Sequence, residues 1–236
     1  MHTNVQPDLA NNKLLAALPG LDRERLRGCL TLVELPFGKV VHEPGTARRS
    51  VFFPIDCVFS KQFATSAGGA AEVASVGNEG LVGIPLLLGC TNTPMRTVVQ
   101  IAGSAWRGDG AVLREELGRS VALQSLILRF TSALMVQMGQ NATCYQHHSL
   151  QQQFCVWLLL MLDRTRSLHL HLTQELIART LGTRRESVNE IAGRLTREGA
   201  IRRGRGFIDV LDRARLERAC CECYRVISRE YARLLP

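Results

Sequence analysis

The segment TQELIARTLGTRRESVNEIAG, residues 173–193, decides the fold, because its apolar residues recur at helical spacing on both sides of one glycine. Gly182 can adopt the positive φ that ends a first helix in a sharp turn, where any side chain would be strained. The small side chain of Ala178 allows a second helix to cross the first at close range. The apolar positions expected to join the two helices are Ile177, Ala178, Leu181, Val188 and Ile191. This spacing predicts a helix-turn-helix with the glycine at its corner.

Two threonines are predicted to begin the two helices. Thr173 can cap the first helix and Thr183 the second, because a threonine hydroxyl accepts a hydrogen bond from a free amide at a helix start. Thr183 and Glu186 also have the spacing of a capping box, in which the glutamate bonds back to the backbone. Glu186 therefore has two open interpretations, as a cap or as an outward-facing side chain.

The outward face of the second helix carries side chains that can pair with DNA bases. The residues expected on this face are Arg184, Arg185, Glu186, Asn189 and Glu190. Arginine pairs with guanine, asparagine pairs with adenine, and a carboxylate accepts a hydrogen bond from cytosine. We therefore predict that Arg184, Arg185, Glu186 and Asn189, together with Thr183 at the helix start, contact DNA. The alternative is a solvated helix face.

Residues 200–212, AIRRGRGFIDVLD, are predicted to form a β-hairpin directly after the second helix. The first strand begins at Ile201, the turn is Gly204–Gly206, and the second strand is Phe207–Leu211. Such a hairpin beside a helix-turn-helix is a wing. Its arginines are expected to lie against phosphates, where they fix the register of binding without reading the base sequence. These arginines are Arg202, Arg203 and Arg205.

The positive charge of the chain is concentrated in its last third. Residues 1–163 contain 13 Lys and Arg against 12 Asp and Glu, whereas residues 164–236 contain 16 Arg against 9 acidic residues. This asymmetry indicates an acidic partner, although a GC-rich coding sequence also explains the use of arginine alone. The longest apolar run, residues 154–162, is shorter than the roughly 20 residues of a membrane span. We expect a cytoplasmic protein with no membrane partner.

Most of the eight cysteines lie isolated within apolar segments, as small buried residues do. The exception is CCEC, residues 220–223, where Cys220 and Cys223 are three residues apart on a predicted helix and can share a soft metal or become oxidised. Packing is the favoured interpretation, because no histidine or second cysteine pair is near in the sequence to complete four ligands. No metal site is predicted.

The remainder of the chain divides into a β-rich part and a helical part. Residues 30–106 contain short apolar runs separated by Gly and Pro, which is typical of an all-β barrel or jelly roll. Residues 109–163 contain no proline and are predicted to form long helices. One apolar stripe of the long helix contains Ile127, Leu134, Met138, Asn141 and Tyr145, and a second contains Val121, Leu128, Met135 and Ala142. An apolar arc this wide predicts that the helix packs both on the β domain and on a second copy of the chain. The alternative is a single helix buried within one core.

Over nearly its full length the sequence resembles the CRP/FNR family of bacterial transcription regulators, most strongly in TQELIARTLGTRRESVNEIAGRLTREGAI. Arg185 and Glu186 correspond to the family's Arg-Glu pair that opens the recognition helix, whereas Glu190 stands where members commonly have a basic residue. The resemblance implies an α+β fold: an N-terminal double-stranded β-helix (jelly-roll, cyclic-nucleotide-binding-like) domain, a long dimerisation helix and a C-terminal winged helix-turn-helix. We assign these to residues 1–118, 119–145 and 146–236.

The resemblance also implies an effector pocket at Gly83, Arg96 and Thr97. Members that bind cyclic AMP have a Gly-Glu pair for the ribose and an Arg-Ser or similar pair for the phosphate. Arg96 and Thr97 match the second pair, but Ile84 follows Gly83 where the glutamate is expected. Isoleucine cannot accept the ribose hydroxyl, and an unpaired buried polar group costs on the order of 1–3 kcal/mol. Cyclic AMP is therefore disfavoured, and Arg96 is left to bind another anion or to anchor a loop.

The sequence leaves the cofactor unknown. An iron–sulfur cluster of the family's N-terminal type is not expected, because no cysteine precedes Cys29. The weak candidates for haem ligands are His42, Cys144, His147 and His148, and lone histidines are more often structural.

Two classes of function remain. The first is a homodimeric, sequence-specific DNA-binding regulator that engages half-sites ~34 Å apart on a pseudo-palindromic duplex, with RNA polymerase as a further partner. The alternative is a ligand- or redox-sensing module with a protein-interaction output, which the poorly matched pocket and residues 220–223 suggest. An enzyme ranks lowest, and no catalytic residue is assigned, because the sequence offers no Ser-His-Asp grouping or phosphate loop.

Overall fold

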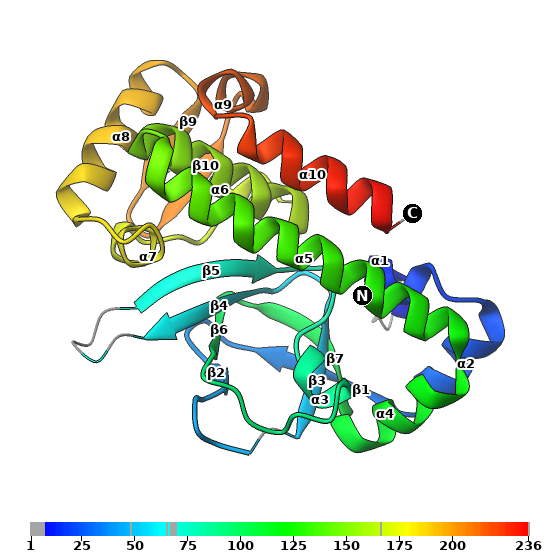
Figure 1. Cartoon of the computed structure of the whole chain (residues 1–236). Coiled ribbons are helices and arrows are strands. Elements are labelled where there is room, and N and C mark those ends of the chain that lie inside the picture. Colours follow the sequence, from blue (N-terminus) through cyan, green and yellow to red (C-terminus); the bar gives the residue numbers. More distant parts are fainter. Residues whose placement is uncertain (1–7, 48, 65, 67–69, 166, 236) are drawn as a thin grey trace, which may run out of the picture.

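The computed structural model describes residues 8–235 apart from residues 48, 65, 67–69 and 166. A β domain, a long helix and a smaller domain of helices around a short sheet follow one another along the chain (Figure 1). The predicted α+β class, with an N-terminal β domain and a C-terminal helix-turn-helix, is confirmed.

The β domain is built from two antiparallel sheets. The first has the order β1 (Leu30–Leu35), β7 (Gly103–Asp109) and β3 (Ser50–Pro54), and the second has the order β2 (Val40–His42), β6 (Arg96–Ile101), β4 (Val58–Ala64) and β5 (Ala70–Val76). Strand residues from both sheets, such as Phe53, Phe59 and Val99, are almost fully buried. The two sheets therefore share one apolar core, as in a sandwich or roll.

Short helices surround this domain. They are η1 (Leu9–Asn11), α1 (Lys13–Ala16), α2 (Gly20–Arg27), α3 (Ile84–Leu87) and α4 (Gly110–Arg119). Asn12, between η1 and α1, attaches these two helices to the β domain. Its buried side-chain amide donates to the carbonyl oxygens of Pro54 and Gly80 at 2.9 Å each. Its Oδ1 accepts from the amide of Leu15 at 3.1 Å and so caps α1.

The long helix α5 (Val121–His147) exposes one of its two predicted apolar stripes. It begins at Ser120, whose hydroxyl accepts a hydrogen bond from the amide of Leu123 at 3.0 Å. In the first stripe, Ile127, Leu134 and Asn141 are buried. In the second stripe, Val121, Leu128 and Met135 are 81%, 65% and 67% exposed. One side of α5 therefore packs within the chain, and a neighbouring apolar side is uncovered.

Length and composition alone would allow α5 to cross a membrane, with a mean hydropathy of 1.4 in its most apolar window, of which 39% is buried in the protein. Two of its polar side chains are bonded inside the molecule. Asn141 donates to the carbonyl oxygen of Val73 at 3.1 Å, and the Gln137 carbonyl accepts from Arg164 at 3.1 Å and from Tyr231 at 2.8 Å. We therefore interpret α5 as a packed helix of the protein.

The apolar run at residues 154–162 forms the middle of α6 (Leu150–Thr165), and all nine of these residues are buried. Such a helix must be surrounded on all sides. It packs against α5, β4 and two helices near the C-terminus, α9 (Arg213–Ala219) and α10 (Cys223–Leu234). Figure 1 shows α10 returning to lie along α5.

Arg164, near the end of α6, joins three parts of the molecule while being almost fully buried. Its guanidinium donates to Glu79 at 2.7 Å and to Ser75 at 2.6 Å in the β domain, and to Gln137 of α5 at 3.1 Å. The approach is close enough that a Cβ on Gly77 would lie 2.5 Å from the Cβ of Arg164. A glycine at this position therefore permits α6 to pack onto the β domain.

Candidate DNA-binding surface

The predicted helix-turn-helix consists of α7 (Gln174–Thr180) and α8 (Arg185–Arg197). Thr173 caps α7 as predicted, because its hydroxyl accepts from the amide of Leu176 at 3.1 Å. The five apolar positions predicted to join the helices are all buried, and they are Ile177, Ala178, Leu181, Val188 and Ile191. The two helices are therefore held together by the residues whose spacing predicted them.

Gly182 forms the corner between α7 and α8 with φ of 62°, in the left-handed region that favours glycine. Its amide donates to the carbonyl of Arg179 at 3.4 Å, and the amide of Thr183 donates to the carbonyl of Ala178 at 2.9 Å. These two hydrogen bonds form a Schellman motif, which satisfies the last carbonyls of α7.

The prediction that Thr183 caps α8 is wrong. Thr183 is already used to close α7, so the N-cap passes to Arg184, which has extended backbone angles and makes no side-chain cap hydrogen bond. Glu186 is then the second residue of α8 and not the third, and the proposed capping box does not form. The exposed carboxylate of Glu186 lies in the first turn of α8, where the helix dipole favours negative charge.

The face of α8 opposite its buried side is open to solvent. The predicted contact residues Arg184, Arg185, Glu186 and Asn189 are exposed, as is Glu190. Among the residues that the structure describes, no side-chain hydrogen bond or ion pair involves Arg184 or Arg185. Both guanidinium groups are therefore available to an external ligand.

The wing follows α8 as predicted, with β9 (Ile201–Gly204) paired antiparallel to β10 (Phe207–Val210). Gly206 has φ of 85° in the turn. Leu211 lies beyond the end of β10 and is 59% exposed, so the predicted extension of the strand to this residue is wrong. A third strand that the sequence analysis missed, β8 (His169–Leu170), pairs with the other side of β10.

The three wing arginines differ in their surroundings. Arg202 forms an ion pair with Asp209 at 2.6 Å between Nη2 and Oδ2. Arg203 donates to the carbonyl oxygen of Asn189 at 2.9 Å and also to the side-chain oxygen of Asn189. Arg205, near the turn, has no side-chain partner among the described residues. Of the three, Arg205 is the one whose guanidinium is free to contact phosphate without breaking an internal contact.

Asn189 joins α7, α8 and the wing. Its Oδ1 accepts from Gln174 at 3.1 Å as well as from Arg203. Pairing with adenine requires this oxygen as an acceptor, so the predicted base contact would have to displace two donors. In this arrangement Asn189 holds α7, α8 and the wing together.

Asp209 holds the base of the wing. Its carboxylate accepts from the His169 ring and from Arg202, and these two hydrogen bonds lower the pKa of Asp209 below its ordinary value. Because His169 belongs to β8 and Arg202 to β9, one carboxylate on β10 connects all three strands of the sheet.

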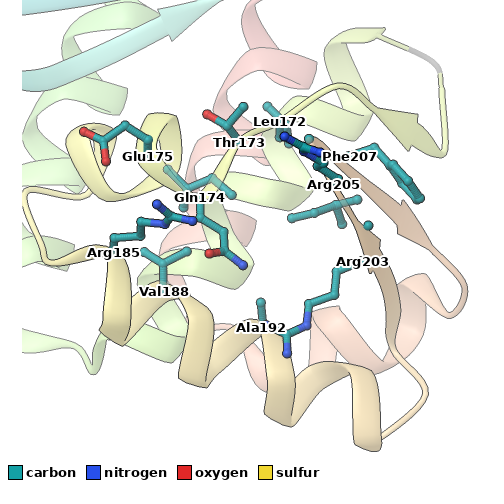
Figure 2. Close-up of a pocket in the computed structure, with 14 residues that line it drawn as sticks. Leu172, Thr173, Gln174, Glu175, Arg185, Val188, Ala192, Arg203, Arg205 and Phe207 are labelled. Carbon is teal, nitrogen blue, oxygen red and sulfur yellow. The ribbon is translucent and has the colours of Figure 1, made fainter.

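A hollow of about 390 Å³ lies between α7, α8 and the wing (Figure 2). Arg185 and Arg203 extend from opposite sides of it, with Arg205 farther along the wing. Val188 and Ala192 form part of its apolar floor. The surface therefore combines a concave shape with positive charge, which suits a phosphate backbone.

Glu190 replaces the basic residue that the resemblance led us to expect, but a basic side chain lies one turn later. Arg194 Nη2 is 3.5 Å from Glu190 Oε1, and Arg194 Nη1 donates to Gln151 of α6 at 3.0 Å. The positive charge on this part of α8 is therefore partly neutralised and directed toward α6.

The three residues predicted for an effector pocket are all within the β domain. Arg96 Nε pairs with Glu43 Oε2 at 3.2 Å, and Thr97 beside it on β6 is buried. Gly83, with φ of 117°, precedes α3, and a Cβ there would lie 3.0 Å from Val51 Cγ2. The Arg96–Glu43 pair favours loop anchoring for Arg96.

The interpretation of CCEC changes with the structure. Residues 220–223 do not share a helix, because α9 ends at Ala219 and α10 begins at Cys223. Cys220 points away, toward the carbonyl of Glu217, while Cys221 and Cys223 lie near Cys144 and His148. The histidine and cysteine that the sequence analysis did not find near residues 220–223 are thus His148 and Cys144, at the end of α5. Their i, i+4 spacing on one helix was the feature of the sequence that could have indicated them.

Comparison with known proteins agrees with this geometry. Residues 152–219 match the Crp-like helix-turn-helix domain. No curated protein matches the sequence.

Three solved structures are similar over most of their length. A Eubacterium rectale protein assigned to the CRP/FNR family of transcriptional regulators has a TM-score of 0.66 and 15% identity, covering 89% of this chain and 98% of its own. FixK2 from Bradyrhizobium japonicum has a TM-score of 0.64 and 15% identity, covering 81% and 98%. A CRP-family transcriptional regulator from Thermus thermophilus has a TM-score of 0.64 and 18% identity, covering 79% and 95%. Residues 152–219 thus match the Crp-like helix-turn-helix domain, and over 79–89% of its length the chain has the fold of these transcription-regulator structures.

Proposed function

We propose that the protein is a cytoplasmic, homodimeric transcription regulator that binds a pseudo-palindromic DNA site. In this proposal α8 enters the major groove, where Arg185 reads a base, and the wing lies along the phosphates with Arg205 in contact. The observation that carries the proposal is the pair of exposed, unpartnered arginines, Arg184 and Arg185, at the start of a helix whose other face is fully packed. This arrangement suits direct readout, because arginine pairs with two atoms of guanine.

The uncovered stripe of α5 supports the dimer. Val121, Leu128, Met135 and Ala142 are seven residues apart and exposed. A sustained apolar heptad is buried when two helices form a coiled coil. A second copy packed here would remove the apolar surface from water and bring two α8 helices to one duplex.

Regulation by an effector at the β domain, and contact with RNA polymerase, are parts of the same proposal. The fold class supports both parts. An anion at Arg96 would have to compete with Glu43 for its guanidinium.

The test begins with selection of bound duplexes from a random library, with and without cell extract, to define the site, its symmetry and any effector dependence. Titrations on the selected site and on random duplex then compare three variants at two salt concentrations. We expect Arg185→Ala to weaken binding to the selected site by about 1–3 kcal/mol and to reduce sequence preference. Arg205→Ala should weaken all duplexes alike and reduce the dependence on salt.

Arg229→Ala is the matched control, because Arg229 is exposed on α10 and its loss removes the same charge. Equal losses for Arg185→Ala on selected and random duplexes would contradict base reading by α8. A wild-type protein with no salt-dependent DNA affinity would favour a sensing module with a protein-interaction output.

A further inference from the structure

Four side chains with metal-binding atoms meet where the end of α5 approaches the link between α9 and α10. They are Cys144, His148, Cys221 and Cys223, and their ligand atoms all lie within 4.8 Å of one another. Cys144 lies in the last turn of α5, His148 directly follows that helix, and the two other cysteines lie where α9 gives way to α10. Three of the four are buried. Cys144 and Cys221 are 77 residues apart in the sequence, so two distant segments of the chain supply one cluster.

Two of the six distances between ligand atoms are close to those of a tetrahedral metal site, and all six are within 4.8 Å. Cys144 Sγ and Cys221 Sγ are 3.6 Å apart, and Cys223 Sγ is 3.4 Å from His148 Nδ1. Tetrahedral zinc, with Zn–S near ~2.3 Å and Zn–N near ~2.0 Å, places two sulfurs ~3.8 Å apart and a sulfur and a nitrogen ~3.5 Å apart. We propose that Cys144, His148, Cys221 and Cys223 bind one zinc ion in a Cys₃His site.

The surroundings of the cluster resemble the outer shell of a metal site. His148 presents Nδ1 to the sulfurs, and its other nitrogen, Nε2, lies 3.3 Å from Glu222 Oε1. A carboxylate at this position fixes the tautomer in which Nδ1 is free to bind a metal. Gln140 Nε2 also donates to Cys223 Sγ at 3.1 Å, a contact that stabilises a thiolate. Glu222 and Gln140 are thus positioning residues for the site.

Four protein ligands would complete the coordination of the metal. Sites of this kind are closed and structural, because no position is left for water or substrate. A bound divalent cation would stabilise the thiolate forms of the cysteines by supplying positive charge.

The site would attach the DNA-binding domain to the long helix. The ligands on one side belong to the end of α5, and those on the other belong to the link that begins α10. Loss of the metal would free this link while leaving α8 and the wing intact. The inference is independent of DNA binding, because it concerns the composition of the purified protein.

The first experiment measures metal in the full-length protein purified under reducing conditions. We expect one zinc per chain by mass spectrometry after gel filtration. Replacement by Co²⁺ should give the visible absorption of a tetrahedral ion and a thiolate-to-cobalt charge-transfer band. Titration of the wild-type thiols with a mercurial should release the zinc, which a colorimetric chelator detects without any mutation.

The chain supplies close controls for the variants. Cys223→Ser and His148→Ala remove ligands, whereas Cys220→Ser and His147→Ala change the neighbouring residues that lie outside the cluster. We expect Cys223→Ser to lose the charge-transfer spectrum and stoichiometric zinc, and both controls to keep them. Zinc affinity, measured by chelator competition, should fall at least ~10-fold in His148→Ala and ~10–100-fold in Glu222→Gln.

Several results would overturn the proposal. One is a reduced wild-type protein that keeps no metal through gel filtration and binds cobalt without the thiolate band. A Cys144–Cys221 disulfide that forms in that metal-free protein when the reductant is replaced by air would assign the cysteines to redox chemistry instead. Equal loss of zinc in Cys223→Ser and Cys220→Ser would show that the spectrum does not report this cluster.

Discussion

Arg164 is a single side chain on which three parts of the molecule depend. Its guanidinium is almost fully buried and pairs with Glu79, which is also buried. We predict that Arg164→Ala lowers the free energy of unfolding by about 3–5 kcal/mol, because it leaves the Glu79 carboxylate without a countercharge in the interior. Urea unfolding of the full chain measures this loss.

The exposed pair of Arg233 and Glu230 provides the comparison for Arg164. The Arg233 side chain is 65% exposed, and solvent-exposed ion pairs contribute little to stability. Arg233→Ala should therefore leave the urea midpoint almost unchanged. Similar losses for both variants would mean that Arg164 does not depend on its buried partner.

Glu72 gives a prediction about pH. Burial raises the pKa of this carboxyl from its ordinary value of 4.5 to about 7. Between these values the unfolded chain releases a proton that the folded chain keeps, so the free energy of unfolding falls as the pH rises. The stability gained by keeping Glu72 protonated is present in full below pH 4.5, declines above this pH and is lost above about pH 7. It amounts to about 3 kcal/mol.

The measurement compares urea unfolding of the wild type and of Glu72→Gln from pH 5 to pH 8. The glutamine cannot ionise, so the difference in unfolding free energy between the two proteins should change in favour of the variant as the pH rises. A difference that stays constant across this range would show that Glu72 keeps the same charge in both states.

At the scale of elements, Gly80 permits the contact between the β domain and α5. A Cβ on Gly80 would lie 1.9 Å from Phe130 Cε2, and Phe130 is fully buried. We predict that Gly80→Ala destabilises the protein by about 1–3 kcal/mol, because the core must shift to make room. Thermal unfolding should show a lower Tm.

Gly118→Ala is the matched substitution, since nothing lies within 4 Å of a Cβ at Gly118 in α4. Alanine is favoured over glycine within a helix by roughly 0.5–1 kcal/mol, so this variant should be as stable as the wild type or more so. A lower Tm for both variants would argue against a steric cause at Gly80.

The elements predictable from sequence were those specified by local patterns. Gly182, the apolar spacing around it and the turn of the wing are features of short segments, and the structure contains them all. The cap predicted at Thr183 does not form, because the Thr183 amide donates back to the carbonyl of Ala178 and closes α7. The two-residue strand β8 has too few residues for any period to be visible.

The candidate site shows the same limit more strongly. Exposure of Arg184 and Arg185 follows from helical periodicity, but the contacts of Arg203 with Asn189 and of Arg202 with Asp209 depend on how the wing folds against α8. The cysteine cluster requires the ends of α5 and α9 to meet. The sequence shows which side chains can bind a metal, but only tertiary packing brings Cys144 and His148 close to Cys221 and Cys223.

At the scale of the whole molecule, the exposed stripe of α5 predicts the state of association. We expect Met135→Glu to convert a dimer into a monomer, because a charge in the centre of an apolar seam would be buried without a partner. Sedimentation equilibrium measures the mass directly. Leu88→Glu is the comparison, since Leu88 is similarly exposed, at 62% against 67%, but lies outside α5.

If Met135→Glu and the wild type have the same mass, two explanations can be separated. A monomeric wild type contradicts the dimer itself, whereas a dimeric variant contradicts only the assignment of the interface to α5. Far-ultraviolet circular dichroism should be unchanged in both variants, because neither side chain is buried within the chain.

The return of α10 to α5 limits how the DNA-binding domain can move. The chain enters this domain through the short connection after His147, and α10 fastens it a second time along the same helix. The hydrogen bonds of Arg164 with Glu79 and Ser75 also fix α6 to the β domain. A reorientation of α8 relative to the β domain would therefore have to break both the packing of α10 on α5 and the hydrogen bonds of Arg164.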